Sequence, residues 1–90
     1  MYTIIDVIGT YPHADGILKE YPDSKLIILD YDEVNEVEDL KGSTVTIIRA
    51  DGSEIHKKVL LSESRHGTVG IYLASTTKEE VPRLSKITWT

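Results

Sequence analysis

Histidines and serines are the residues of this 90-residue chain that could take part in catalysis or zinc binding. His13, His56 and His66 do not have the spacing of zinc ligands, and the chain has no cysteine to complete such a site. Ser62 or Ser64, together with His66 and any nearby aspartate, could be imagined as a hydrolytic triad. The G-x-S-x-G motif of a nucleophile elbow is absent, however, and polar loops commonly contain serine and histidine. We therefore expect no catalytic residue and no enzyme activity.

The carboxylates of the segment Asp30-Tyr-Asp32-Glu33 could offer oxygen ligands to a hard cation. The segment lacks the central glycine and the final glutamate that an EF-hand loop uses to wrap its calcium ion. No other group of side chains matches a known cofactor motif. We expect neither a metal site nor a cofactor.

Charge is distributed unevenly along the chain. Residues 1–42 carry a net charge of about −7 and residues 43–90 about +2, within a total of −5. An acidic chain is repelled by phosphate, so we expect no broad binding to DNA. The acidic residues 30–39 could simply form a solvated face that keeps a small protein soluble. If they bind a partner, the predicted partner-binding residues are four of these acids and three bases of the second half: Asp32, Glu33, Glu36, Glu38, Lys57, Lys58 and Arg65.

Length and composition are those of one globular domain, residues 1–90. The chain has no cysteine, and the lack of disulfides favours a cytoplasmic location. Met1 is followed by no basic region of a signal peptide. The longest apolar run, Leu26–Leu29, is far too short for a membrane-spanning helix. We therefore expect no association with a membrane.

Short apolar runs bounded by turn residues predict β-strands along most of the chain. The clearest signal is a hairpin, in which residues 43–49 and 53–61 pair around Asp51-Gly52 with both turn residues at positive φ. Further strands are predicted at residues 2–8, 17–20, 25–31, 68–74 and 86–90.

Two segments favour a short helix. Apolar residues recur at three-residue steps between residues 34 and 42, and Gly42 could end a helix in the left-handed conformation. Thr77-x-x-Glu80 matches a capping box, and Pro82 limits any helix there to about one turn. Residues 10–22 could form either a helix or a loop followed by a strand.

This pattern predicts an all-β fold, a small antiparallel β-barrel of six or seven short strands with one or two short helical segments. Closure of the sheet removes the exposed edges that would invite aggregation. Lys57 shares the inward register of its strand, so we expect it at a barrel rim or beyond a bulge. The predicted core consists of Ile47, Ile55, Val59, Leu61, Val69, Ile71, Leu73, Ile87 and Trp89.

The stretch VGIYLASTTKEEVPRLSKI near the C-terminus resembles the end of the second-domain β-barrel of translational GTPases of the elongation factor Tu type. In that family a Val-Gly-Leu-x-Leu strand is followed by a charged segment that ends Glu-Asp-Ile-x-Arg-Gly, and then by a closing strand. LKGSTVTII also resembles an earlier strand of that barrel. The residues that match without a gap are Val69, Gly70, Leu73, Glu79, Glu80, Val81 and Arg83.

The resemblance covers about half of the chain, and two of its glycines are replaced. Ala74-Ser75 stands where the family has Arg-Gly after the strand, and Leu84 stands where it has glycine after the arginine. The chain lacks the G-x-x-x-x-G-K-[ST] motif, so it is not itself a GTPase. The resemblance implies a small β-barrel and a partner related to translation or to a ribonucleoprotein.

Two functions follow as expectations. The first is a non-catalytic β-barrel module that binds a protein or ribonucleoprotein partner, as the resemblance implies. The second is an acidic inhibitory or immunity-type protein that masks a basic partner with its acidic cluster, as the small size and the uneven charge suggest.

Overall fold

The computed structural model describes residues 1–9, 23–30, 32–33, 39–65 and 68–89, without the side chains of Arg65 and Thr68. These residues form six strands and contain no helix. The predicted all-β class is therefore confirmed. The strands are β1 (Tyr2–Gly9), β2 (Lys25–Leu29), β3 (Thr44–Ile48), β4 (Glu54–Arg65), β5 (Thr68–Leu73) and β6 (Lys86–Thr88).

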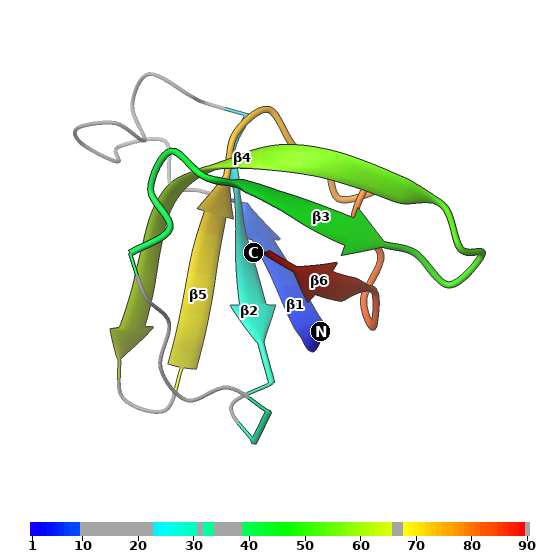
Figure 1. The fold of residues 1–90 in the computed structure, drawn as a ribbon, viewed down its shortest axis with the longest axis horizontal. Helices are drawn as coiled ribbons and strands as arrows, with labels where there is room; N and C mark the ends of the chain where they lie inside the picture. Colours follow the sequence, from blue (N-terminus) through cyan, green and yellow to red (C-terminus); the bar gives the residue numbers. More distant parts are fainter. Residues whose placement is uncertain (10–22, 31, 34–38, 66–67, 90) are drawn as a thin grey trace.

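The six strands form a closed antiparallel barrel in the order β1-β2-β5-β4-β3-β6, and β6 pairs back with β1 (Figure 1). The predicted small antiparallel barrel is thus confirmed. Each described strand has a strand neighbour on both sides along part of its length, so the barrel leaves no described strand as a fully open edge.

Two strands turn the corners of the barrel by changing partners along their length. Residues 54–58 of β4 pair with β3, and residues 59–65 pair with β5, so that β4 curves over the barrel in Figure 1. In the same way, residues 2–3 of β1 pair with β6, and the strand continues from Ile4 along β2.

A register irregularity marks both corners, between Val59 and Leu61 in β4 and between Ile4 and Asp6 in β1. A bulge inserts a residue, bends its strand and increases the local twist. The two bulges therefore supply the bending that a six-stranded sheet needs to close on itself.

The interior is filled by aliphatic side chains from the six strands, and Leu40 and Val81 reach it from connecting segments. Six of the nine predicted core residues are completely buried: Ile47, Val59, Val69, Ile71, Leu73 and Ile87. Ile55 and Trp89 are partly buried and pack against this core, and the Trp89 ring lies 5.0 Å from the ring of Tyr2 between centroids.

The prediction for Leu61 was wrong, because Leu60 is completely buried and Leu61 only half-buried. Strict alternation from Ile55 through Lys57 and Val59 places Leu61 inside, but the bulge adds one residue directly after Val59. The strand also continues past residue 61, to Arg65.

The hairpin between β3 and β4 forms as predicted, but with a different turn. Gly52 is left-handed with a φ of 87°, whereas Asp51 is not among the residues with positive φ. The Gly52 N–H donates to the Arg49 carbonyl and the Arg49 N–H to the Ser53 carbonyl, both at 2.9 Å. This is the pattern of a three-residue loop that ends in a left-handed glycine, so one positive φ is sufficient.

The predicted helical segments are not seen in the described part of the chain. Residues 77–80 form turns, and residues 39–42 are coil and turn, with Gly42 left-handed at a φ of 84°. The rest of the 34–42 helix prediction, the 17–20 strand and the alternatives for residues 10–22 lie outside the described residues.

The bulge in β4 makes a testable prediction. Truncation of Leu60 to alanine removes a fully buried side chain and should lower the free energy of unfolding by about 2–5 kcal/mol. The same truncation of half-buried Leu61 should have a clearly smaller effect. Urea denaturation of both variants measures the difference, and a larger effect at Leu61 would show that β4 has no bulge there.

Candidate binding surface

The connection from β5 to β6, residues 74–85, is the longest described segment without strand or helix and is called here the β5–β6 loop. It is anchored from within: Val81 and Thr76 are buried, at 1% and 0% exposure. The Thr76 hydroxyl donates to the Ala74 carbonyl at 2.9 Å, and the Thr76 N–H donates to the Asp23 carbonyl at 3.0 Å. The loop is therefore fixed to the barrel close to its start.

The predicted capping box forms, although no helix follows it. The Thr77 N–H donates to Glu80 Oε1 at 2.9 Å, and the Glu80 N–H donates to Thr77 Oγ1 at 3.3 Å. The Glu80 N–H is shared with the Thr77 carbonyl, and the Val81 N–H donates to the Lys78 carbonyl, both at 3.2 Å. The motif thus specifies these local hydrogen bonds without extending them into a helix.

Two basic residues of the β3–β4 hairpin hold the middle of the loop. Lys57 Nζ lies 2.8 Å from Glu80 Oε2 and donates to the Ser75 carbonyl at 2.8 Å. Arg49 Nε donates to the Glu80 carbonyl at 2.9 Å. The Lys57 side chain is only 14% exposed and that of Glu80 33%, so the ion pair is partly shielded from water.

The hydrogen bond from Lys57 is the largest of several causes that lower the pKa of the Glu80 carboxyl from its ordinary value of 4.5. The second is the hydrogen bond from the Thr77 backbone. Burial acts in the opposite direction and raises the pKa, but it is outweighed. Glu80 is accordingly held ionised by the partners that anchor the loop.

Two residues in this loop, Ser75 and Leu84, are the non-glycine residues with positive φ in the described part of the chain, at 48° and 68°. Left-handed backbone is strained for residues with a Cβ atom and is usually taken by glycine.

The end of the loop joins β6 to β1. The Ser85 N–H donates to the Pro82 carbonyl at 3.2 Å, which closes a turn with Leu84 at its third position. The Leu84 N–H then donates to the Ile4 carbonyl at 2.8 Å, and the Ile4 N–H donates to the Ser85 carbonyl at 2.9 Å. Leu84 and Ser85 thus lie opposite the single residue Ile4 across the strands. The first of the two, Leu84, is left-handed, as in a G1 bulge.

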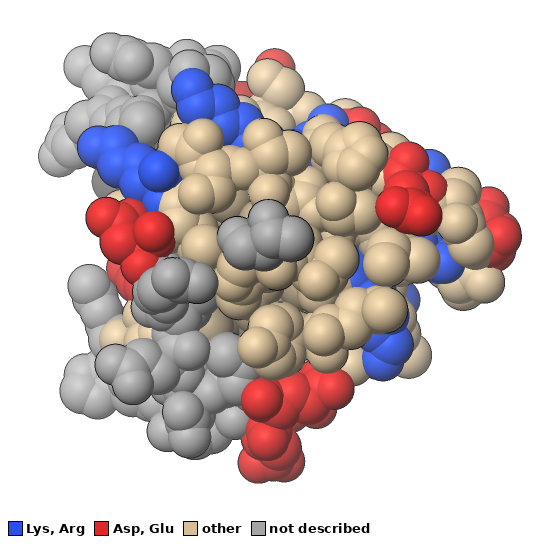
Figure 2. Space-filling view, in the orientation of Figure 1, with Lys and Arg blue, Asp and Glu red and all other residues tan. Residues whose placement is uncertain are grey.

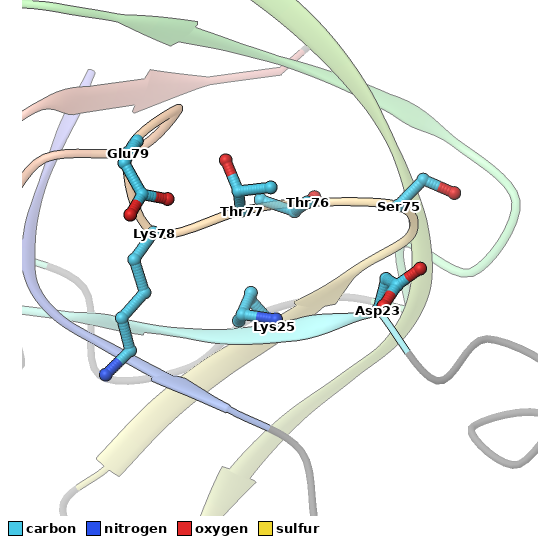
Figure 3. Close-up of a pocket in the computed structure, with 7 residues that line it drawn as sticks. All are labelled: Asp23, Lys25, Ser75, Thr76, Thr77, Lys78 and Glu79. Carbon is cyan, nitrogen blue, oxygen red and sulfur yellow. The ribbon is translucent and has the colours of Figure 1, made fainter.

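A hollow of about 390 Å³ lies beside the loop, lined by Asp23, Lys25, Ser75, Thr76, Thr77, Lys78 and Glu79. Figure 3 shows that these side chains do not converge on one point: Lys78 extends away from Thr77, and Asp23 and Ser75 stand together at the far end. Its two acids and two lysines balance in charge. The hollow therefore has the character of a contact surface more than of a reaction site.

The acidic turn after β2, which contains Asp30, Asp32 and Glu33, is hydrogen-bonded to the start of β1. The Asp30 N–H donates to the Thr3 carbonyl at 3.1 Å, and the Thr3 N–H donates to Glu33 Oε1 at 2.7 Å. Hydrogen bonds from the Thr3 side chain and backbone lower the pKa of Glu33 below its ordinary value. Asp30 Oδ1 accepts from the Asp32 N–H at 3.0 Å, so a carboxylate also shapes the turn itself. Glu33 has a structural role that the sequence did not indicate.

The predicted partner-binding residues do not form one described cluster. Asp32 and Glu33 are exposed in the acidic turn, Lys58 is exposed on β4, and Lys57 is committed to Glu80. Glu36, Glu38 and the Arg65 side chain lie outside the described residues. In Figure 2 the blue basic side chains stand in separate groups around the visible face, and acidic side chains project at its lower edge. The described residues of that face form no continuous basic patch.

The residues first considered for chemistry are only partly described. His56 Nδ1 lies 3.0 Å from Thr46 Oγ1 on the barrel exterior, and Ser62 Oγ accepts the Leu40 N–H at 3.1 Å. His13 and His66 lie outside the described residues, so the serine–histidine arrangement stays untested.

Within the described ranges, no group of three or more histidine, aspartate or glutamate residues is placed to hold a metal ion. The same residues include no helix with the length and hydrophobicity of a membrane span. A scan of the chain against protein-family models found no match, and searches of curated proteins and of solved structures found none either.

Leu84 was missed as a surface residue by sequence reasoning, and so was the contact of Arg83 with β1. Leu84 is 65% exposed, and Arg83 Nε donates to the Ile5 carbonyl at 2.9 Å. The one signal that could have indicated Leu84 is its place where the expected resemblance puts a glycine. That signal can be interpreted physically only when the geometry of the turn is known.

Glu80 gives a prediction about pH. Its folded-state pKa is lower than the unfolded value of 4.5, so its stabilising contribution is present above pH 4.5 and is lost as the pH falls through the folded pKa. Glu80→Gln should lower the free energy of unfolding at neutral pH and make its decline below pH 4.5 less steep. Urea denaturation over a pH series measures both effects, with exposed Glu79→Gln as the matched control. Equal pH profiles for Glu80→Gln and the wild type would contradict this role.

Proposed function

We propose that the protein is a non-catalytic binding module that presents the β5–β6 loop to a macromolecular partner. The observation that carries this proposal is the number of anchors on one surface loop. Its backbone is held by the capping box and by Lys57 and Arg49 from the hairpin, and its own Arg83 side chain donates to the Ile5 carbonyl of β1. A surface that is already ordered loses less conformational entropy on binding.

The exposed residues of this loop fit recognition of a folded partner. Lys78 and Glu79 are exposed beside the hollow of about 390 Å³, and Pro82, Arg83 and Leu84 are exposed at the other end of the loop. The loop therefore offers charged groups, hydrogen-bonding groups and one large apolar side chain on a fixed backbone. Protein interfaces combine an apolar centre with a polar rim in this way.

The resemblance to the second-domain barrel of translational GTPases supports a partner related to translation or to a ribonucleoprotein. The positive φ values of Ser75 and Leu84 support the alignment of the two chains, because they occur where that pattern has glycine. A likeness in fold does not by itself specify a function, so the partner class rests on the resemblance alone.

A charge exchange within the loop tests the proposal. The double variant Lys78→Glu/Glu79→Lys keeps the composition and net charge but reverses the local charge pattern. Both side chains are exposed, so the melting temperature should stay within the range of ordinary surface substitutions. Wild type and variant are immobilised, exposed to extract of the source organism, and compared by quantitative mass spectrometry. We expect at least one partner to bind the wild type and to be lost, by about tenfold or more, from the variant.

The matched control exchanges two exposed charges on the outward face of β4, Glu54→Lys/Lys58→Glu. Loss of a protein partner from the loop variant alone supports the loop as the binding surface. Loss of an RNA partner from the control alone places the contact on β4 instead. Identical partners for all three proteins, or a specific turnover by the pure wild type, would overturn the proposal.

The acidic turn favours a second candidate function, an inhibitory or immunity-type protein that masks a basic protein. The specific observation is the anchoring of the turn on Thr3, which keeps Glu33 ionised while Asp32 is exposed beside it. An ordered acidic projection attracts a basic surface over roughly the Debye length, about 8 Å at physiological salt. Such steering acts mainly on the association rate.

This second function makes its own prediction. Asp32→Asn should slow association with a basic partner and reduce the dependence of the rate on salt, because Asp32 contributes charge without bonding to Thr3. The combined replacement of Asp32, Glu33, Glu36 and Glu38 by Asn or Gln should enlarge the effect. Stopped-flow association rates at low salt and at about 0.15 M salt measure it. An unchanged association rate would exclude the acidic turn as the binding surface. A faster rate would indicate an acidic or phosphate-bearing partner.

A further inference from the structure

The first part of β4, residues 54–58, has one side along which no described strand lies. β3 pairs with its other side, and β5 begins to pair with β4 only at Val59. In Figure 1 this part of β4 borders the β3–β4 hairpin, which projects to the right beyond the other strands. It therefore presents a strand edge, up to the point at which Ala74 meets Lys58.

The hydrogen bonds at the two ends of the hairpin show which backbone groups face this edge. The Arg49 N–H donates to the Ser53 carbonyl, and the Val59 N–H donates to the Ser43 carbonyl. Because hydrogen-bonded and non-hydrogen-bonded pairs alternate in an antiparallel ladder, residues 53, 55, 57 and 59 face β3. Residues 54, 56 and 58 face the other way.

The outward direction is visible at Lys58, whose carbonyl accepts the Ala74 N–H at 3.0 Å. At Glu54 and His56, in contrast, the N–H and C=O groups have no backbone partner among the described residues. Unpaired backbone groups in a row are a template for another strand. The partner that they fit is an extended segment of polypeptide.

We propose that this segment is the same part of β4 in a second copy of the chain, so that two barrels pair edge to edge in a two-fold symmetric dimer. A two-fold axis through the edge makes the two strands antiparallel, and the same residues then meet in both copies. The side chains of the edge complement themselves in one register, and this favours a second copy over other extended segments.

The register follows from what each residue would face across the axis. With Glu54 on the axis, the Glu54 carboxylates of the two copies would oppose each other, which is unfavourable across strands. With His56 on the axis, Glu54 would have to lie opposite Lys58, where Ala74 already meets the edge. With Ile55 on the axis, Glu54 of each copy lies opposite His56 of the other, and the outward N–H and C=O groups of both residues are paired.

Unlike side chains meet on the outer face in this register. Glu54 and His56 are both exposed. The Thr46 hydroxyl lies 3.0 Å from His56 Nδ1, so Nε2 is the ring nitrogen that can donate to the Glu54 carboxylate of the second copy. On the inner face the partly buried Ile55 meets its own counterpart at the axis and adds an apolar contact.

The charged groups around the edge do not oppose this contact. With His56 counted as neutral they are three bases and three acids, Arg49, Lys57, Lys58, Asp51, Glu54 and Glu80. Lys57 and Glu80 form an ion pair within each copy. The edge is thus locally neutral although the chain has a net charge of −5, so pairing here brings together no surplus of one sign.

The expected dimer is weak, because each copy contributes two hydrogen-bonding residues to the new ladder. Stable interfaces bury about 800 Å² per partner, and a ladder this short supplies less. Association should therefore depend on concentration in the micromolar to millimolar range.

Sedimentation equilibrium over this concentration range tests the side-chain pairing. The average mass of the wild type should rise from the 10.1 kDa monomer towards about twice this value. Glu54→Lys removes the acid that faces His56, and His56→Glu places two acids opposite each other. Each change occurs twice in the dimer and should weaken association by about tenfold. The double variant Glu54→Lys/His56→Glu restores unlike charges across the axis and should recover the association.

The matched control for charge is Asp32→Lys, which makes the same change of charge in the acidic turn, at an exposed residue. It should dimerise at least as well as the wild type, because it lowers the net negative charge without touching the edge. Weakening by Glu54→Lys but not by Asp32→Lys would therefore support a contact at the edge.

Proline tests the backbone pairing separately. Glu54→Pro removes an N–H that faces away from β3, at the first residue of β4, where proline is compatible with the strand of the monomer. Its melting temperature should stay close to that of Glu54→Gln, but its association should be lost over the measured range. Glu54→Gln keeps the N–H and should still dimerise, more weakly than the wild type.

Backbone amide NMR at increasing concentration locates the contact. The shifts of Glu54 and His56 should change in the wild type, and that of His56 should stay constant in Glu54→Pro. A wild type that is monomeric throughout would overturn the proposal and leave this edge to solvent or to an extended segment of another protein. A double variant as weak as its single variants, dimerisation of Glu54→Pro, or shift changes confined to another surface would overturn it too. Because no other protein is added, these results are independent of whether the β5–β6 loop binds a partner.

Discussion

Closure of the barrel between β1 and β6 is the constraint on which the rest of this structure depends. The ladder itself consists of only two residue pairs, Tyr2 with Ile87 and Thr3 with Lys86. It is extended by the two hydrogen bonds between Ile4 and the Leu84–Ser85 bulge, and the packed rings of Tyr2 and Trp89 lie at its other end. Without this short seam the sheet would be open, and an open sheet exposes unpaired edges.

The seam explains why the β5–β6 loop is built so tightly. The loop leaves β5, which lies between β2 and β4, and must bring β6 between β3 and β1. Val81 packs into the core on the way, and Lys57 and Arg49 fix Glu80 from the hairpin. The left-handed residues lie near the two ends of this path, where the chain changes direction. The same anchors that close the barrel thus produce an ordered external surface.

The electrostatic properties of the surface also follow from structural contacts. Lys57 and Glu33 looked like free charges suited to a partner, but one forms a partly shielded ion pair and the other holds the start of β1. Glu33 can hold the start of β1 and also contact a partner, because its hydrogen bond to Thr3 leaves the carboxylate exposed and ionised. Fewer charges are therefore available to bind a partner than the composition suggests, and these charges lie on ordered turns.

The sequence by itself determined the approximate positions of the six described strands, the pairing of the hairpin and the capping box, because each depends on residues within a few positions of one another. Alternation of side chains likewise identified most of the core, from Ile47 to Ile87. Only the tertiary structure decided where the strands change partners, and with it the bulge that exchanges Leu61 for Leu60. Closure of a six-stranded barrel needs bending at its corners, and that requirement comes from residues far apart in the chain. For the same reason, the sequence could not show that Leu84 is left-handed and exposed: its turn is completed by hydrogen bonds to Ile4, some eighty positions away, across the seam.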